Sequence, residues 1–135
     1  RIGEKTAEEI KLSLGAALIG GMERRQFKGR SLKTGLPECV ALTGGEVSHA
    51  IAPTVRKIVD SVRRTLSETP PELAADLIDT GIVLTGGGAK LKGLDKLISH
   101  ETGLKVSIAE DPMYCVALGA LKLGSGEDMD APRYA

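Results

Sequence analysis

Aromatic residues are scarce in this sequence: its 135 residues include two tyrosines, one phenylalanine and no tryptophan. Proteins that read single-stranded nucleic acids or sugars stack their ligands on aromatic side chains, so the scarcity argues against both classes. The two cysteines, Cys39 and Cys115, stand far apart, as do the two histidines, His49 and His100. Their spacing provides neither a zinc-ligand pattern nor a disulfide framework.

Long apolar runs and a net charge are also missing. No stretch comes near the ~20 apolar residues that cross a bilayer, and 18 basic side chains balance 18 acidic ones. We therefore expect a soluble, globular chain with an aliphatic core. Because the sequence opens on Arg1-Ile2-Gly3, without a Met or an apolar leader, we expect it to come from a longer protein.

The two halves of the chain carry opposite charge. Residues 1–68 hold 12 basic and 8 acidic side chains, whereas residues 69–135 hold 6 and 10. Such polarity favours head-to-tail association, although monomers commonly carry charges of this size. One short segment concentrates the positive charge in Arg24, Arg25, Lys28, Arg30 and Lys33. A single aromatic residue lies among them, so a solvated face or a protein contact fits this segment better than nucleic acid does.

The first 43 residues have the pattern of a helix followed by a hairpin. A capping box at Thr6–Glu9 predicts the start of the helix, and Gly20-Gly21 predicts its end. The predicted buried stripe of this helix comprises Ala7, Ile10, Leu14 and Ala17. Two short runs, 22–28 and 36–43, flank a long loop and predict a β-hairpin.

A second capping box, at Thr43–Glu46, predicts a long amphipathic helix that ends at Thr69-Pro70-Pro71. Pro53 falls inside it and removes one backbone donor, so we expect a kink or a break at that point. The predicted buried stripe comprises Val47, Ile51, Val55, Ile58, Val62 and Leu66.

The remaining pattern predicts a short helix and then a βαβα unit. The short helix is expected over 71–77. The unit comprises a strand at 82–84, a helix at 89–101, a strand at 104–108, and a last helix capped by Asp111 and ending near 123. A crossover through a helix implies that the two strands are parallel. Residues 125–135 are short and polar and are expected to form a flexible tail.

A glycine turn joins the first strand of this unit to its helix. Thr85-Gly86-Gly87-Gly88-Ala89-Lys90 leaves backbone N–H groups free of β-carbons at a helix start, where a phosphate or a ribose-phosphate edge can bind. A tight turn that needs positive φ explains the glycines equally well. The turn matches neither the dinucleotide-binding fingerprint nor the P-loop, because Leu91 follows where the first needs glycine and no Gly-Lys-Ser/Thr ending is present.

A charged pair lies on the first helix. Glu8 and Lys11 are three residues apart and share one face, where the carboxylate could accept from a ribose hydroxyl and the ammonium could donate to an adenine edge. Glutamate and lysine at this spacing are also ordinary on solvent faces. The sequence contains no paired carboxylates beside a nucleophile, no Ser/His/Asp set and no metal cluster, so nothing in it is expected to run a reaction alone.

Several stretches together resemble one family in order and spacing. They are 2–11, Gly29-Arg30, Gly35-Leu36-Pro37, 69–76, 84–89 and 109–112. They are similar to the carboxy-terminal half of the MreB family, the bacterial actin-like proteins that determine cell shape. The resemblance runs from Arg1 to about Gly124 and is far more specific than a lone glycine turn.

The resemblance implies an α/β fold: an actin-like, ribonuclease H-like ATPase lobe in which an α+β subdomain is inserted into a βαβα unit. Residues 1–68 would be the smaller inserted subdomain, and 69–124 the βαβα part of the larger one. In such proteins the two motifs face each other across the adenosine of ATP. The implied nucleotide-binding residues are Glu8, Glu9, Ile10, Lys11, Gly86, Gly87, Gly88, Ala89 and Lys90.

In the family that this chain resembles, two lobes enclose ATP, and this segment would belong to the second of them. Mg²⁺ and the catalytic groups would belong to the other lobe, so this segment alone is expected to turn over little or no ATP. The whole protein would form head-to-tail filaments at the inner face of the membrane, in the cytoplasm, with a membrane-anchored adaptor and the cell-wall elongation machinery as partners. No nucleic acid and no direct membrane insertion are expected. The alternatives are a nucleotide-independent interaction module and an Hsp70-like or sugar-kinase-like ATPase lobe.

Overall fold

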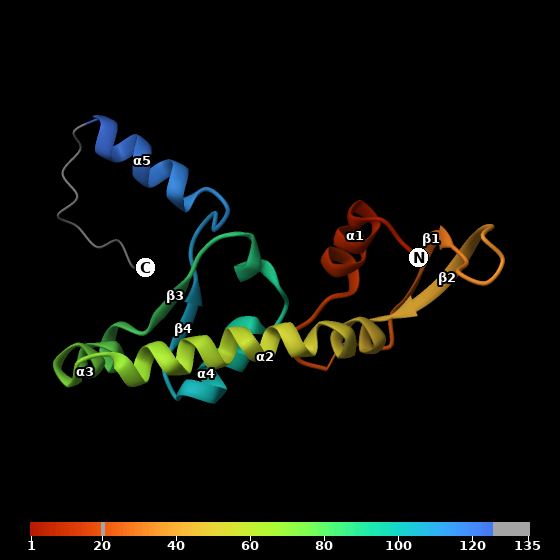
Figure 1. Cartoon of the computed structure of the whole chain (residues 1–135). Coiled ribbons are helices and arrows are strands. Elements are labelled where there is room, and N and C mark those ends of the chain that lie inside the picture. Colours follow the sequence, from red (N-terminus) through yellow and green to blue (C-terminus); the bar gives the residue numbers. More distant parts are fainter. Residues whose placement is uncertain (20, 126–135) are drawn as a thin grey trace.

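One long helix organises the molecule. The computed structural model describes residues 1–19 and 21–125, and in it helix α2 (Gly44–Glu68) extends between two groups of elements (Figure 1). Helix α1 (Glu4–Leu14) and the hairpin of β1 (Arg24–Arg30) and β2 (Pro37–Thr43) lie at the amino-terminal end of α2. The remaining elements lie toward its other end: α3 (Pro71–Thr80), β3 (Ile82–Leu84), the 3₁₀ turn η1 (Gly87–Lys90), α4 (Leu94–Thr102), β4 (Val106–Ile108) and α5 (Cys115–Ser125).

Two separate hydrophobic cores lie along α2. The first is formed by Ile10, Leu14, Phe27 and Val47, with Leu42 packed against it. The second is formed by Val55, Val59, Leu94 and Ile98, with partly buried side chains from β3, β4 and the segment after α1 around it. Because α2 contributes to both cores, it fixes the two groups of elements relative to each other. The division of the chain into subdomains at residue 68 stays a prediction.

Helix α1 differs from the sequence expectation at both ends. It begins at Glu4 with Gly3 at the N-cap, and the Ala7 N–H donates to the Gly3 carbonyl at 3.0 Å, so Thr6 lies inside the helix and caps nothing. It ends at Leu14 rather than at Gly20-Gly21. A β-carbon at Gly15 would lie 2.4 Å from the Lys11 carbonyl oxygen, which explains why a glycine ends the helix there. Of the predicted stripe only Ile10 and Leu14 are buried.

Helix α2 confirms its predicted start and corrects its interior. Thr43 and Glu46 form the reciprocal capping box. The helix continues through Pro53 without a break, because buried packing on both sides, at Val47 and Val55, outweighs the loss of one backbone hydrogen bond. The predicted stripe holds at Val47 and Val55 and differs at one position, where Val59 (6% exposed) is buried in place of Ile58 (40% exposed).

The second half contains the expected parallel pair of strands. Ile82, Val83 and Leu84 pair with Val106, Ser107 and Ile108. The helix expected over 89–101 is instead divided into η1 and α4, because Gly93 takes a left-handed conformation (φ 77°) between them. The last helix starts at Cys115 and not at Asp111, which has a positive φ of 45° and therefore is no N-cap.

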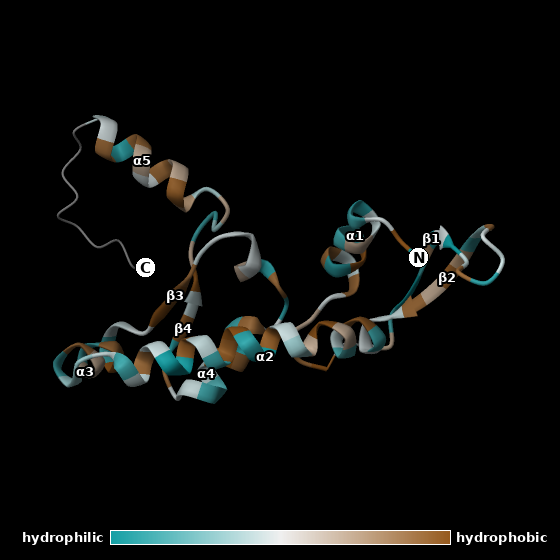
Figure 2. Cartoon of the chain, viewed as in Figure 1, coloured by the Kyte–Doolittle hydropathy of each residue, from teal (hydrophilic) through white to brown (hydrophobic). Residues whose placement is uncertain are grey.

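Helix α5 includes Ser125, which the sequence assigned to the predicted tail, and the remaining residues of that prediction, 126–135, lie outside the described part of the chain. No residue of α5 is buried. Val116, Leu121 and Leu123 are 84%, 69% and 66% exposed, and apolar residues are frequent along the helix in Figure 2. Short isolated helices are marginal in water, so α5 needs packing that the described residues do not supply.

Candidate nucleotide-binding site

The glycine turn leaves β3 at Gly86 and is anchored on both sides. Gly86 has a φ of 79°, a conformation that favours glycine, and its N–H donates to the Pro112 carbonyl at 2.6 Å. Next in the turn, the Ala89 N–H donates to the Gly86 carbonyl at 3.2 Å, and the Ala89 side chain is buried. The backbone of the turn is therefore held in place from β3 and from the segment that precedes α5.

Gly87 and Gly88 are the two residues of the turn that the fold itself does not explain. Neither has a positive φ, and a β-carbon at either position would meet no atom within 4 Å. Their backbone N–H groups donate to no acceptor among the residues that the structure describes. They lie at the start of η1, where free N–H groups are available to an anionic or hydroxyl-bearing ligand.

Helix α1 presents the charged pair on its exposed side. The Lys11 Nζ lies 2.7 Å from the Glu8 Oε2, and the two side chains are 47% and 56% exposed. The structure thus contains the ordinary solvent-face pair, and the same two groups stay accessible to a ligand. Glu9 is exposed as well, but the Ile10 side chain is 6% exposed and belongs to the first core.

The two motifs are connected through the segments that follow them. Ala16 forms a parallel bridge with Lys92, and the Ala17 N–H donates to the Lys92 carbonyl at 2.8 Å. Next to this bridge, a β-carbon at Gly93 would lie 3.2 Å from the Leu18 side chain. The chain that leaves α1 is therefore packed against the chain that leaves η1, and both motifs lie above α2 in Figure 1.

No direct interaction joins the motifs in the described part of the chain. No hydrogen bond or ion pair there links Glu8 or Lys11 to residues 86–90. The bridge between Ala16 and Lys92 fixes the positions of the two motifs relative to each other. The exposed side of each motif stays accessible to a ligand. Exposed Lys90 adds a positive charge at the end of the turn.

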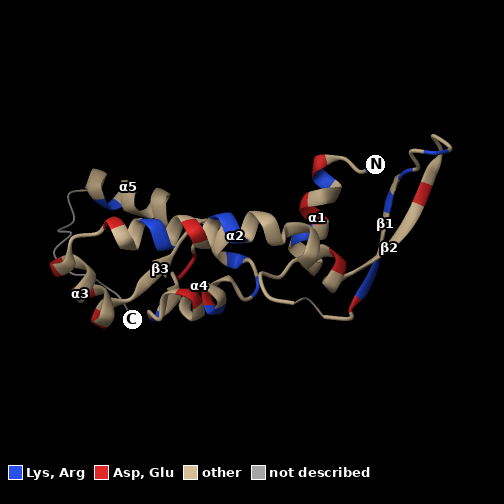
Figure 3. Cartoon of the chain, turned by 60° about the horizontal axis from the view of Figure 1, so that its bottom comes forward, with Lys and Arg blue, Asp and Glu red and all other residues tan. Residues whose placement is uncertain are grey.

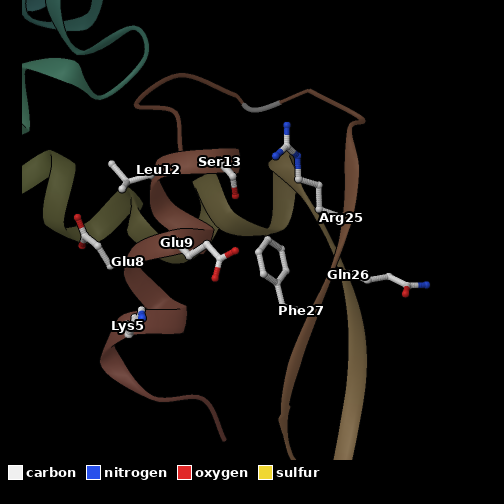
Figure 4. Close-up of a pocket in the computed structure, with 8 residues that line it drawn as sticks. All are labelled: Lys5, Glu8, Glu9, Leu12, Ser13, Arg25, Gln26 and Phe27. Atoms are coloured by element: carbon white, nitrogen blue, oxygen red, sulfur yellow. The ribbon is translucent and has the colours of Figure 1, made fainter.

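No sequence pattern predicts the hollow beside α1. An open hollow of about 620 Å³ lies between α1 and β1, and its lining is labelled in Figure 4: Lys5, Glu8, Glu9, Leu12, Ser13, Arg25, Gln26 and Phe27. Glu9 and Ser13 point toward Phe27 in this view. The hollow arises from packing between α1 and the strand that follows it, which periodicity within either element does not reveal.

The residues that the structure describes contain no group of three or more His, Cys, Asp or Glu side chains placed to hold a metal ion. None of the described helices has the length and apolar content needed to span a membrane.

Comparisons with known proteins identify relatives over almost the whole chain. The model of the family described as MreB/Mbl protein matches residues 1–131. The cell shape-determining protein Mbl of Bacillus cereus is 44% identical over 119 residues, which cover 87% of this chain and 36% of the relative. The cell shape-determining protein MreB of Escherichia coli K12 is 45% identical over 122 residues, which cover 90% and 35%. The chain thus spans about a third of the length of these relatives.

Solved structures agree with the sequence matches. MreB5 of Spiroplasma citri bound to ADP superposes with a TM-score of 0.86 at 33% identity, covering 93% of this chain and 38% of that one. A second structure of the same protein, bound to AMPPNP, gives the same values. The MamK double helical filament superposes with a TM-score of 0.72 at 23% identity, covering 98% and 39%, and shows likeness of fold alone.

Proposed function

The chain belongs to the MreB/Mbl family and has an actin-like α/β fold, and we propose that it supplies the adenosine side of an ATP-binding clamp. The observation that carries this proposal is the pair of unexplained glycines, Gly87 and Gly88. Glycine costs conformational entropy relative to alanine. At these positions a β-carbon would occupy the space next to the backbone. Glycine leaves that space open, so a ribose or a phosphate can approach the backbone closely.

Each of the predicted nucleotide-binding residues is assigned a contact that fits its position in the structure. The backbone of Gly86, Gly87 and Gly88 lies against the ribose-phosphate edge, and Lys90 adds positive charge beside it. Glu8 accepts from a ribose hydroxyl, and Lys11 donates to the adenine edge, once the ion pair between them opens. Glu9 contributes at the rim, whereas Ile10 and Ala89 act through their backbone and through the packing of their buried side chains.

The comparisons support this proposal through the relatives' own ligands. The two Spiroplasma citri structures are described as bound to ADP and to AMPPNP. This chain superposes on them over 93% of its length. Mg²⁺ and the groups that hydrolyse ATP are expected from the other lobe of the clamp, so this segment alone binds nucleotide weakly and without turnover.

A substitution that fills the space next to this backbone tests the proposal. We expect Gly87→Val to weaken the binding of fluorescent ADP by about tenfold or more, or about 1.4 kcal/mol, because its side chain occupies the space of the ligand. Gly119→Val is the matched control, since its β-carbon position is also open and its φ is not positive. Equal affinity in both variants would refute the proposal.

The proposal extends to the whole protein that contains this chain. Relatives are named cell shape-determining proteins, and we infer an ATP-dependent, head-to-tail filament in the cytoplasm at the inner face of the membrane. A membrane-anchored adaptor and the cell-wall elongation machinery are its inferred partners. The mass of the natural polypeptide and an ATP-dependent pelleting assay on it test this extension: a complete polypeptide of 14.1 kDa, or one that forms no polymer, would contradict it.

One observation favours a second candidate, a nucleotide-independent interaction module. Glu8 and Lys11 satisfy each other in an exposed ion pair, as they would in a helix face with no ligand to bind. A module of this kind folds stably and has no measurable affinity for ADP, ATP or AMPPNP. The same binding assay therefore separates the two candidates.

A further inference from the structure

The free edge of strand β1 shows an unpaired row of backbone groups. Two hydrogen bonds flank the β1–β2 ladder: the Gly44 N–H donates to the Glu23 carbonyl at 3.1 Å, and the Ser31 N–H donates to the Leu36 carbonyl at 2.9 Å. On the β1 side, these two hydrogen bonds involve odd-numbered residues, Glu23 and Ser31. Because bonded and unbonded positions alternate in an antiparallel ladder, Arg24, Gln26, Lys28 and Arg30 direct their N–H and C=O groups away from β2.

One position of this edge already pairs with an added strand. The Arg30 N–H donates to the Arg1 carbonyl at 2.8 Å, and the Arg1 amino group donates to the Arg30 carbonyl. This exchange of two hydrogen bonds is the pattern of an antiparallel pair. After Ile2 the chain enters α1 at Glu4, and within the described chain the backbone groups of Arg24, Gln26 and Lys28 have no partner.

Three basic side chains lie along the outer face of this edge. Arg24, Lys28 and Arg30 share the outer face of the hairpin, and Figure 3 shows the basic residues along β1. Their cross-strand neighbours on that face are neutral: Thr43, Cys39 and Pro37. Among the described residues none of these three basic side chains forms an ion pair with a carboxylate.

The other face of the edge borders a hollow of mixed lining, in which Phe27 and Leu12 are apolar and Glu8, Glu9, Lys5 and Arg25 are charged. Phe27 is 7% exposed and borders the hollow of about 620 Å³ between α1 and β1, with Arg25 and Gln26 beside it. The side chains of a strand added to this edge would thus alternate between the basic outer face and the face that holds buried Phe27 with Arg25. Strand addition uses backbone hydrogen bonds for affinity and alternate side chains for specificity.

We propose that the free edge of β1, from Arg24 to Lys28, binds an extended acidic peptide of a partner protein as an added β-strand. The peptide places acidic side chains opposite Arg24 and Lys28 and an apolar side chain opposite Phe27. Its acidic residues are therefore four positions apart, with an apolar residue next to one of them. The edge itself includes no residue of the proposed nucleotide site, although Glu8 and Glu9 of that site line the hollow beside Phe27.

A second copy of this chain fits the edge less well. Antiparallel pairing of two β1 edges centred on Gln26 would place Arg24 of each copy opposite Lys28 of the other. Like charges directly opposite each other destabilise a strand pair, and cationic edges are a common protection against self-pairing. A strand that binds this edge therefore has to be negatively charged.

A labelled peptide with the core sequence Glu-Val-Thr-Val-Glu tests the proposal by fluorescence anisotropy against the whole chain. We expect saturable binding that the matched Lys-Val-Thr-Val-Lys peptide does not show. We also expect the amides of Gln26 and Lys28 to become protected from hydrogen exchange when the acidic peptide binds. Equal binding of both peptides, or no binding of either at millimolar concentration, would overturn the proposal.

Two variants at one position separate strand addition from simple charge attraction. Gln26→Pro removes an N–H that points away from β2, which edge strands tolerate, whereas Gln26→Ala keeps it. We expect the proline variant to bind the acidic peptide about tenfold more weakly or worse and the alanine variant to bind normally, with equal melting temperatures. Unchanged binding by the proline variant, tighter binding of a DNA oligonucleotide, or dimerisation through this edge would each refute the proposal.

Discussion

The two motifs of the candidate site differ in how much of them the fold explains. In α1, the Glu8–Lys11 ion pair and the buried Ile10 are what any amphipathic surface helix would show. In the glycine turn, Gly86 needs its positive φ, but Gly87 and Gly88 have neither strain nor crowding to account for them. The turn is therefore the stronger evidence for a ligand, although α1 carries the more conspicuous charges.

The cores beneath the two motifs differ as well. The turn rests on the core that contains Ile98, which is 1% exposed and surrounded by many partly buried apolar side chains. The core beneath α1 is smaller, and beside its Val47 lies Ser48, a buried residue whose hydroxyl has no hydrogen-bond partner in the described part of the chain. We expect the turn side to be the more rigid of the two.

If the second core is the more tightly packed of the two, the largest loss of stability is expected from a substitution at Ile98. Replacing it with alanine leaves a cavity in the better-packed core, and we expect Ile98→Ala to lower the free energy of unfolding by about 2–5 kcal/mol. Ile58→Ala is the matched control, because Ile58 is 40% exposed on the neighbouring helix. Urea unfolding monitored by circular dichroism measures both. Similar losses in the two variants would mean that the second core is not the more tightly packed one.

Within the glycine turn, Gly86 and its neighbour Gly87 are expected to respond differently. Gly86→Ala forces a β-carbon into a left-handed conformation, and we expect a loss of about 1 kcal/mol in stability. Gly87→Ala should change stability by less than about 0.5 kcal/mol, because no strain or clash arises there. Thermal unfolding of the two variants decides the point. An equally destabilised Gly87→Ala would show that the fold, and not a ligand, requires that glycine.

On the α1 side, removing the orphaned hydroxyl of Ser48 is expected to stabilise the protein. A buried donor without a partner carries a desolvation cost, so Ser48→Ala should raise the free energy of unfolding by about 1 kcal/mol and raise the melting temperature. Ser61→Ala serves as a comparison, since the Ser61 hydroxyl donates to the Lys57 carbonyl at 2.9 Å on the same helix. A destabilised Ser48→Ala would indicate that the hydroxyl has a partner in solution.

The sequence predicted the order of the elements and the parallel βαβα unit well, because apolar periodicity, the Thr43–Glu46 capping box and the glycines and prolines between elements are local signals. It mispredicted boundaries wherever a distant segment decides them. After Gly15 ends α1, the chain pairs with Lys92 through Ala16, and the left-handed Gly93 that divides η1 from α4 lies beside Leu18. Neither contact is visible in the periodicity of one segment.

The same limit applies to the candidate site. Motif spacing identified the glycine turn and the charged pair, but only geometry distinguishes Gly86, which the backbone conformation requires, from Gly87 and Gly88, which it does not. The hollow beside Phe27 and the free edge of β1 depend on how α1 and the hairpin pack, and no residue pattern encodes that packing.

Acid is expected to loosen the α1 side before the turn side. Hydrogen bonds from the Thr43 backbone and side chain, with a smaller contribution from Arg24, lower the pKa of Glu46 from its ordinary value. The stabilisation from this capping box is therefore present above the unfolded-state pKa of about 4.3 and is lost as the pH falls through the lower folded-state pKa. Amide exchange near Val47 should rise at that pH more than exchange near Ile98. In Glu46→Gln this difference should disappear.

The smallest expected effect on stability is at the Glu8–Lys11 pair. Both partners are about half exposed, so either Glu8→Gln or Lys11→Gln should change the free energy of unfolding by only a few tenths of a kcal/mol, about 0.2–0.5, and less at high salt. If the pair binds adenosine, the same substitutions weaken ADP binding severalfold while the fold is unaffected. The exposed Arg63–Glu101 pair, at 3.3 Å, is the control, because Arg63→Gln removes a comparable ion pair away from both motifs. Equal ADP affinity in Glu8→Gln and Arg63→Gln would leave the glycine turn as the only nucleotide contact of this chain, and the contrast between the two motifs would then be one of function as well as of structure.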